Sequence, residues 1–231
     1  MQSIGPFLDC IGLTGPRRLV ADFFGLRKVP PGETLSLRQH LERVANPAII
    51  HLNVIRVGFH TLEPLERERA ERELDLVVHR TRQIYDQIFT GVARVQHFEV
   101  AASQVGGFAD IGSNGEADDL TDSFSVDNDG IDSFFVLTYA ENRVGSARVS
   151  GCDKDGKDSG VVVEIGQGDD ELTATAYAHE LAHFLGVEDH SSDENNLMFS
   201  GQNGRKINSS QAAKIVTHCF TKECPDLSAL L

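Results

Sequence analysis

The sequence predicts a mixed α/β (α+β) fold with five strands and three main helices. Two observations support it: short runs of β-branched residues recur along the chain, and elsewhere apolar residues recur at three and four residue intervals. A chain of 231 residues is long enough for one domain with a sizeable core. We expect residues 46–231 to form that domain. Residues 1–45, rich in proline and glycine, are expected to be an N-terminal appendage or a pro-segment.

The expected elements follow one another in a simple order. Residues 48–59 alternate at period two, which is typical of a strand. Residues 63–89 are amphipathic with Pro64 in the first turn, and therefore predict a long helix. The remaining elements are strands at 93–102, 133–140, 145–150 and 160–166, a loop at 103–132, and helices at 171–185 and 209–220, the last capped by Ser209.

Charge and composition exclude several classes of partner. The formal net charge of -14 repels phosphate, so neither a nucleic acid nor an anionic membrane is expected as a partner. No stretch approaches the roughly 18 apolar residues of a membrane span, and the N-terminus lacks the pattern of a secretory signal. We expect a cytoplasmic protein as written, or a secreted one if a longer precursor is trimmed, and we assume a monomer. The four cysteines predict either a Cys219–Cys224 bridge or free thiols.

The segment AHELAHFLGVEDH, residues 178–190, carries the most distinctive chemistry. On a helix, residues four apart differ by about 40° in angle and about 6 Å in rise, so His179 and His183 present two imidazoles to one point. Such a pair suits zinc. Glu180, about 100° around from His179, is placed to reach a metal-bound water and is the candidate general base. The pattern H-E-x-x-H is expected roughly 0.02 times by chance in a chain of this composition.

A zinc ion in a catalytic site needs a third protein ligand. Gly186 predicts that the helix ends in a left-handed residue, after which the chain turns back beneath the metal. Asp189 and His190 both follow this turn. Both are chemically competent, because zinc accepts a carboxylate oxygen or an imidazole nitrogen.

These residues resemble the signature of the metzincin zinc metallopeptidases. The matching residues are His179, Glu180, His183 and Gly186, and the segment NNLMFSG at 195–201 is similar to a matrixin Met-turn. The resemblance covers about residues 48–220. It implies a zincin fold with a twisted, mostly parallel five-stranded sheet, a long helix, an active-site helix and a C-terminal helix. It also implies that Met198 forms a hydrophobic floor beneath the zinc ligands.

The resemblance bears on the third ligand in two ways. The usual histidine position, three residues after the glycine, holds Asp189, as in snapalysin-like members. His190, however, precedes Met198 by eight residues, as the matrixin ligand precedes its methionine. We therefore favour His190 as the third ligand and keep Asp189 as the alternative.

The resemblance implies a zinc-dependent endopeptidase that acts on a protein or peptide substrate. Water activated by zinc, with Glu180 as general base, would hydrolyse the peptide bond. The substrate would lie along the edge strand, represented here by Gly145, Ser146, Ala147 and Arg148. The alternative is a latent or non-catalytic zinc-binding module that recognises a protein partner, with residues 1–45 blocking the cleft in the latent form.

Calcium is a second metal hypothesis. Two loops share the pattern D-x-D-G-x-D-S, in which alternate aspartates around a glycine can offer oxygens to calcium. Turns that lead into strands favour the same residues without any metal. The carboxylates concerned are Asp127, Asp129 and Asp132 in the first loop and Asp153, Asp155 and Asp158 in the second.

Overall fold

The computed structural model describes residues 48–140, 144–148, 151–152, 154, 160–166, 170–201 and 204–223. Within them a six-stranded sheet runs in the order β2-β1-β4-β7-β6, with β8 also paired to β1. The strands are β1 (Ala48–Arg56), β2 (Thr90–Glu99), β4 (Ile131–Val136), β6 (Gly145–Ala147), β7 (Gly160–Glu164) and β8 (Thr221–Glu223). The first three and β7 are parallel, whereas β6 and β8 run antiparallel to their neighbours. The predicted α/β fold with a mostly parallel sheet is confirmed.

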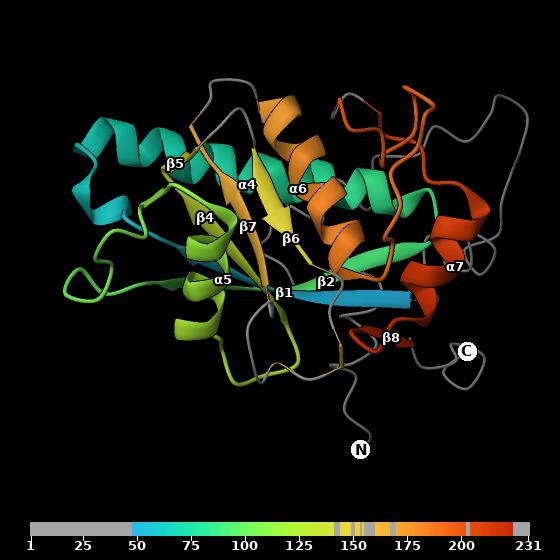
Figure 1. Ribbon diagram of the computed structural model, residues 1–231, viewed down its shortest axis with the longest axis horizontal. Helices are drawn as coiled ribbons and strands as arrows, with labels where there is room; N and C mark the ends of the chain where they lie inside the picture. The colour runs from blue at the N-terminus through green and yellow to red at the C-terminus, as the bar shows by residue number, and fades with distance from the viewer. Residues whose placement is uncertain are drawn as a thin grey trace, which may run out of the picture.

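Helices cover both faces of this sheet. The long helix α4 (Pro64–Asp86) and helix α6 (Asp170–Phe184) pack together on one face, and α5 (Asn114–Ser123) packs on the other. Figure 1 shows α4 running along the molecule, α6 crossing it, and α5 well apart from both. The remaining elements are the 3-10 helix η1 (Phe59–Thr61), helix α7 (Ser209–Thr217) and a small sheet of β3 (Asp110–Ile111) and β5 (Thr138–Tyr139).

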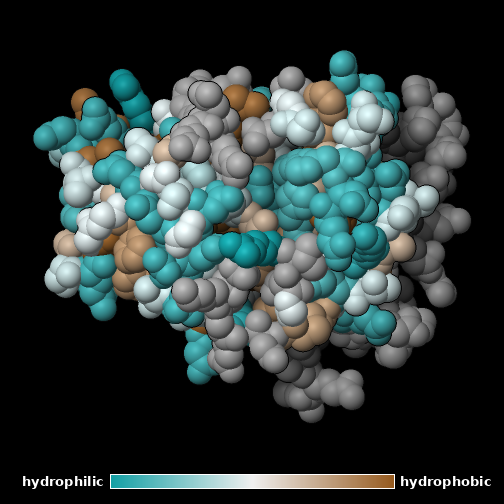
Figure 2. Space-filling model, viewed as in Figure 1, coloured by the Kyte–Doolittle hydropathy of each residue, from teal (hydrophilic) through white to brown (hydrophobic). Residues whose placement is uncertain are grey.

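The central strand β4 shows how the sequence builds two cores. All six of its residues are buried, as expected for a parallel strand with helices on both faces. Ile131 and Phe135 join the core under α4 and α6, while Phe134 and Val136 join the core under α5. The surface seen in Figure 2 is mostly hydrophilic, in keeping with the charge of the chain.

Three expectations about the elements were wrong. The predicted loop 103–132 contains α5, whose N-cap Ser113 accepts a hydrogen bond from the Glu116 N–H. The sheet has six strands instead of five, because β8 adds to β1. Helix α7 is capped by Asn208 in place of Ser209, in a capping box with Gln211.

The cysteine pairing also differs from the prediction. Cys219 is bonded to Cys152, with Cα atoms 5.7 Å apart, and not to Cys224. The bond joins the segment after β6 to the turn between α7 and β8. Cys10, Cys224 and the predicted N-terminal appendage lie outside the described residues. No helix of the described part of the chain is long and apolar enough to cross a membrane.

Candidate metal and catalytic site

The site is built on the last two turns of α6 and on the turn that ends this helix. Gly186 adopts the left-handed conformation, with φ 93°, as the sequence predicted. The Val187 N–H donates to the Ala182 carbonyl and the Gly186 N–H donates to the His183 carbonyl, both at 3.0 Å. These two bonds form a Schellman motif. The turn sends the chain back toward the histidines of α6.

Three imidazoles converge beside this turn. The Nε2 atoms of His179 and His183 are 3.1 Å apart, and those of His179 and His190 are 3.3 Å apart. The remaining pair, His183 and His190, is separated by 3.4 Å. In a tetrahedral zinc site with Zn–N bonds of about 2.0–2.1 Å, the nitrogens lie about 3.3–3.4 Å apart. The three side chains therefore fit zinc, and they are the one group of this kind among the described residues.

The other ring nitrogens of the two helix histidines are held by backbone carbonyls. His179 Nδ1 donates to the Leu197 carbonyl at 2.7 Å, and His183 Nδ1 donates to the Val187 carbonyl at 2.6 Å. A carbonyl can only accept, so each Nδ1 carries the proton and each Nε2 keeps its lone pair. Metal-binding histidines almost always have such a partner, which fixes the tautomer and the ring orientation.

Burial keeps these two imidazoles neutral. The pKa of His179 is lowered from 6.5 to about 4, mainly by burial and in smaller part by the neighbouring His183 and His190. The pKa of His183 is also lowered, again mainly by burial. A neutral imidazole is the form that binds a metal ion, so both side chains are ready for metal at neutral pH.

Glu180 belongs to α6, and its side chain faces the edge strand β6. The residue is buried, with 7% of its surface exposed. A Cβ atom added to Gly145 would lie 3.3 Å from Glu180 Cγ and 2.6 Å from the Val162 carbonyl oxygen. Only glycine leaves room for this close packing, so Gly145 lets β6 pack directly against the Glu180 side chain.

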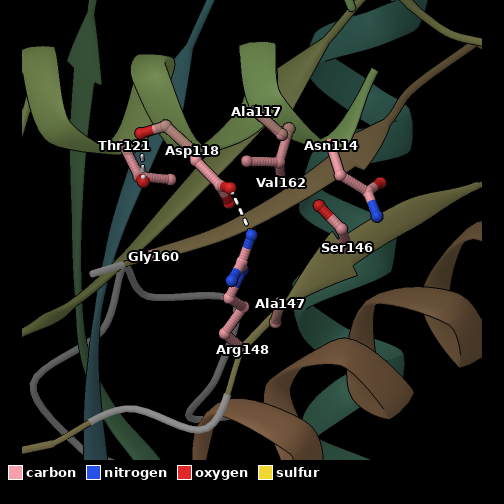
Figure 3. Close-up of a pocket in the computed structure, with 9 residues that line it drawn as sticks. All are labelled: Asn114, Ala117, Asp118, Thr121, Ser146, Ala147, Arg148, Gly160 and Val162. Atoms are coloured by element: carbon pink, nitrogen blue, oxygen red, sulfur yellow. Dashed lines mark hydrogen bonds and ion pairs between the residues drawn. The ribbon is translucent and has the colours of Figure 1, made fainter. Parts of the chain in front are cut away.

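The residues of β6 alternate between the two faces of the sheet. Ala147 packs against the core under α6, whereas Ser146 accepts a hydrogen bond from the Tyr139 hydroxyl on the α5 face at 2.8 Å. Figure 3 shows Arg148 reaching from the end of β6 to Asp118 on α5, across a small pocket next to Ser146. The strand is at the edge of the sheet, as the sequence predicted.

The structure places the other predicted site residues as follows. His190 joins the two helix histidines, while Asp189, its exposed neighbour, is not part of the group. Met198 is 1% exposed and lies in the main apolar core together with Leu181 and Leu197. The segment that carries Met198 is hydrogen-bonded to the residue that follows His190, because the Ser191 N–H donates to the Met198 carbonyl at 2.8 Å.

The first aspartate loop does not gather its carboxylates. Asp132 is fully buried, and its partners include the Lys154 ammonium at 3.0 Å and the Asn53 amide at 2.6 Å. Asp129 instead pairs with Arg94 and His51. Among the described residues, no acidic group forms a metal cluster. Calcium is therefore not supported at this loop, and Asp153, Asp155 and Asp158 of the second loop lie outside the described residues.

Sequence reasoning missed the groups that hold the histidines in place. The carbonyls of Val187 and Leu197 carry no sequence signal of their own, because every residue has a carbonyl. One side chain that takes part in this arrangement, Gln211, did leave a signal. The spacing of Asn208 and Gln211 is that of a capping box, which marks Gln211 as a residue with a bonded side chain.

Comparison with known proteins gives only remote likenesses. The sequence matches no protein family and no curated protein. Among solved structures, archaemetzincin from Methanopyrus kandleri is similar over 71% of this chain and 93% of its own, with 16% identity and a TM-score of 0.46. Metalloproteinase-II from Bacteroides fragilis is similar over 74% of this chain and 53% of its own, with 13% identity and a TM-score of 0.47. A zinc-dependent peptidase from Methanocorpusculum labreanum is similar over 71% of this chain and 99% of its own, with 10% identity and a TM-score of 0.46.

Proposed function

We propose that the protein is a zinc-dependent endopeptidase with His179, His183 and His190 as its zinc ligands. The observation that carries this proposal is the convergence of three Nε2 atoms at 3.1–3.4 Å, in a geometry that zinc fits. The hydrogen bonds from two Nδ1 atoms to carbonyls support it, because they leave the converging nitrogens unprotonated. A set of three protein ligands is typical of catalytic zinc, since it leaves one position for water or substrate.

Glu180 is the proposed general base. It follows His179 directly on α6, so its side chain leaves the helix about 100° around from that ligand. When bound, zinc polarises the substrate carbonyl and acidifies the attacking water. Glu180 takes the proton from that water and then delivers it to the leaving amine. The buried position of Glu180 beside Gly145 keeps this carboxylate next to the path of the substrate.

The substrate is proposed to be an extended segment of a protein or peptide. Among the residues that the structure describes, the strand β6 pairs with β7 on one side only, so its other side is a template for an added strand. Main-chain hydrogen bonds to Gly145–Ala147 would hold the substrate with little regard to its sequence. Met198, buried behind the histidines, is proposed to support the ligands as in a Met-turn.

The test combines metal analysis with hydrolysis. Zinc content by elemental analysis and cleavage of a denatured protein mixture are measured for the wild type and for Glu180→Gln, His190→Ala and Asp189→Ala. We expect close to one zinc per chain in the wild type, Glu180→Gln and Asp189→Ala. We expect zinc to be lost from His190→Ala, and cleavage by Glu180→Gln to fall about 10²–10⁴-fold, the range for loss of a general base.

Asp189→Ala is the matched control, since it changes the neighbouring side chain on the same turn. Loss of zinc from Asp189→Ala with retention by His190→Ala would overturn the assignment of the third ligand. A wild type that holds zinc but cleaves nothing would overturn the enzymatic function and favour a binding module. A wild type that holds no zinc would overturn the whole proposal.

A further inference from the structure

The peptide group between Leu197 and Met198 is hydrogen-bonded through both its C=O and its N–H. Its carbonyl accepts the His179 Nδ1–H at 2.7 Å, and its N–H donates to the Asn196 side-chain oxygen at 2.9 Å. A trans peptide group is planar, with its C=O and N–H pointing in opposite directions. The bond to Asn196 therefore fixes the direction in which the Leu197 carbonyl points. That carbonyl in turn orients the His179 ring.

The Asn196 side chain is itself held by Gln211 in a reciprocal pair of amides. Asn196 Nδ2 donates to Gln211 Oε1 at 3.0 Å, and Gln211 Nε2 donates to Asn196 Oδ1 at 2.9 Å. Both residues are buried, with 4% and 8% of their surfaces exposed. Asn196 Oδ1 has to face the Met198 N–H, so the rest of the network allows only one orientation of each amide.

Gln211 connects this pair to the start of α7. Gln211 Oε1 also accepts the Asn208 backbone N–H at 3.0 Å, and the backbone N–H of Gln211 donates to Asn208 Oδ1 at 2.9 Å. A continuous series of hydrogen bonds thus runs from the N-terminus of α7 through the two amides and one peptide group to His179. A buried network in which every group has a partner is rigid, so the two amides hold the peptide group that they contact in a fixed orientation.

We propose that Asn196 and Gln211 are positioning residues, which clamp the Leu197–Met198 peptide group and so hold the His179 ring in its metal-binding orientation. This inference rests on the proposed metal site. Neither side chain touches the converging nitrogens or a substrate. Their contribution is to the geometry and affinity of the metal, and it is separate from the role of Glu180.

The experiment measures metal binding directly, with Co²⁺ and Zn²⁺ as probes in competition with a chelator at neutral pH. The variants are Asn196→Leu, which removes the clamp, and Gln211→Glu, which places a carboxylate oxygen against Asn196 Oδ1 but keeps the bond to the Asn208 N–H. We expect each to weaken binding of both metals about 10-fold, the lower end of the range for partners of ligating histidines. The visible spectrum of bound Co²⁺ should also change, because it reports ligand geometry.

Asn208→Ala is the matched control. It removes the side-chain oxygen that accepts the Gln211 backbone N–H, but it keeps the Asn208 N–H that donates to Gln211 Oε1 and leaves the two amides and the peptide group in place. We expect its metal affinity and Co²⁺ spectrum to equal those of the wild type. Thermal unfolding of all variants without metal separates general destabilisation from an effect on the site.

Two results would overturn the inference. One is wild-type affinity and spectrum in both Asn196→Leu and Gln211→Glu. The other is a loss of affinity in all three variants that follows only their thermal stability. Either result, in a wild type that binds both metals, leaves the proposed metal site standing. A wild type that binds neither metal contradicts the proposed function itself.

Discussion

The three histidines and the first aspartate loop are two of the places where the sequence predicts a metal, and their ligand groups are arranged differently in the folded chain. His179, His183 and His190 bring three nitrogens within 3.4 Å of one another. Asp129 and Asp132 turn toward separate partners, Arg94 on one side and Lys154 on the other. Both motifs have suitable ligand atoms, but only the histidines direct them to one point.

The difference lies in what satisfies each ligand group. The two helix histidines, His179 and His183, use Nδ1 for a carbonyl and keep Nε2 for another partner. The carboxylate of Asp132 has both oxygens engaged, one by Asn53 and Lys154 and the other by the Val126 N–H at 3.0 Å. The ammonium of Lys154 supplies the positive charge that a calcium ion would otherwise bring. A ligand motif predicts a metal site only when the protein leaves its lone pairs uncommitted.

The largest expected effect is that zinc is lost when one of the three histidines is replaced, but not when an aspartate of the first loop is replaced. His183→Ala should reduce the zinc content from about one per chain to none, because two ligands do not make a catalytic zinc site. Asp129→Ala should retain the wild-type content, since its carboxylate already serves Arg94 and His51. Elemental analysis after dialysis decides the comparison. Equal zinc content in the two variants would contradict it.

The two regions should also differ in how added metal changes stability. Zinc at about 1,000 times its dissociation constant should raise the free energy of unfolding by about 4 kcal/mol, because it binds only the folded chain. Calcium at the same concentration should leave it unchanged. Urea unfolding of chelator-treated protein with each ion makes the measurement. Stabilisation by calcium would show that the aspartate loops hold a cation after all.

Replacement of Lys154, which pairs with Asp132 of the first aspartate loop, should lower the stability of the fold but leave the zinc content unchanged. Lys154→Met should lower the free energy of unfolding by about 3 kcal/mol, because it leaves the buried carboxylate of Asp132 without its cation. The double variant with Asp132→Asn should recover part of the loss. Urea unfolding of the single and double variants gives the coupling. Additive losses would mean that the ion pair contributes little.

The metal-free protein should lose stability as the pH falls from about 6.5 to about 4. The unfolded chain takes up a proton on His179 below its ordinary pKa of 6.5, whereas burial delays this in the folded chain until the pKa of about 4. Unfolding is therefore increasingly favoured as the pH falls through that window, by up to about 3 kcal/mol. Urea unfolding against pH, compared with His179→Asn, isolates this contribution. An unchanged slope in the variant would contradict it.

The sequence predicted those parts of the fold that depend on residues close to one another in the chain. The spacing of His179 and His183 on a helix sets their convergence, and the left-handed Gly186 follows from the geometry of helix ends. Helix α5 was missed because its acidic, polar composition is typical of loops. Its signals were the cap Ser113 with Glu116 three residues later and the buried Ala117 and Leu120.

The rest depends on contacts between distant segments. The sequence favoured His190 over Asp189 only through its spacing to Met198, because the path of the chain after Gly186 decides which side chain reaches the two helix histidines. The partner of Cys219 was likewise beyond prediction, since four cysteines allow several pairings. The amide pair of Asn196 and Gln211 joins residues 15 positions apart. The series of hydrogen bonds that connects this pair to His179 becomes apparent only in the folded chain.

The disulfide between Cys152 and Cys219 encloses the candidate metal ligands and Glu180 in one covalent ring. The two cysteines are 67 positions apart, and the ring includes Glu180, the three histidines and both positioning amides. Proteolytic nicking is concentrated in exposed segments, and the segment around Asp189 and Glu194 is on the surface. A single cut there would leave the two pieces joined. Such a nicked molecule would run as an intact chain on a gel until a reducing agent opened the ring.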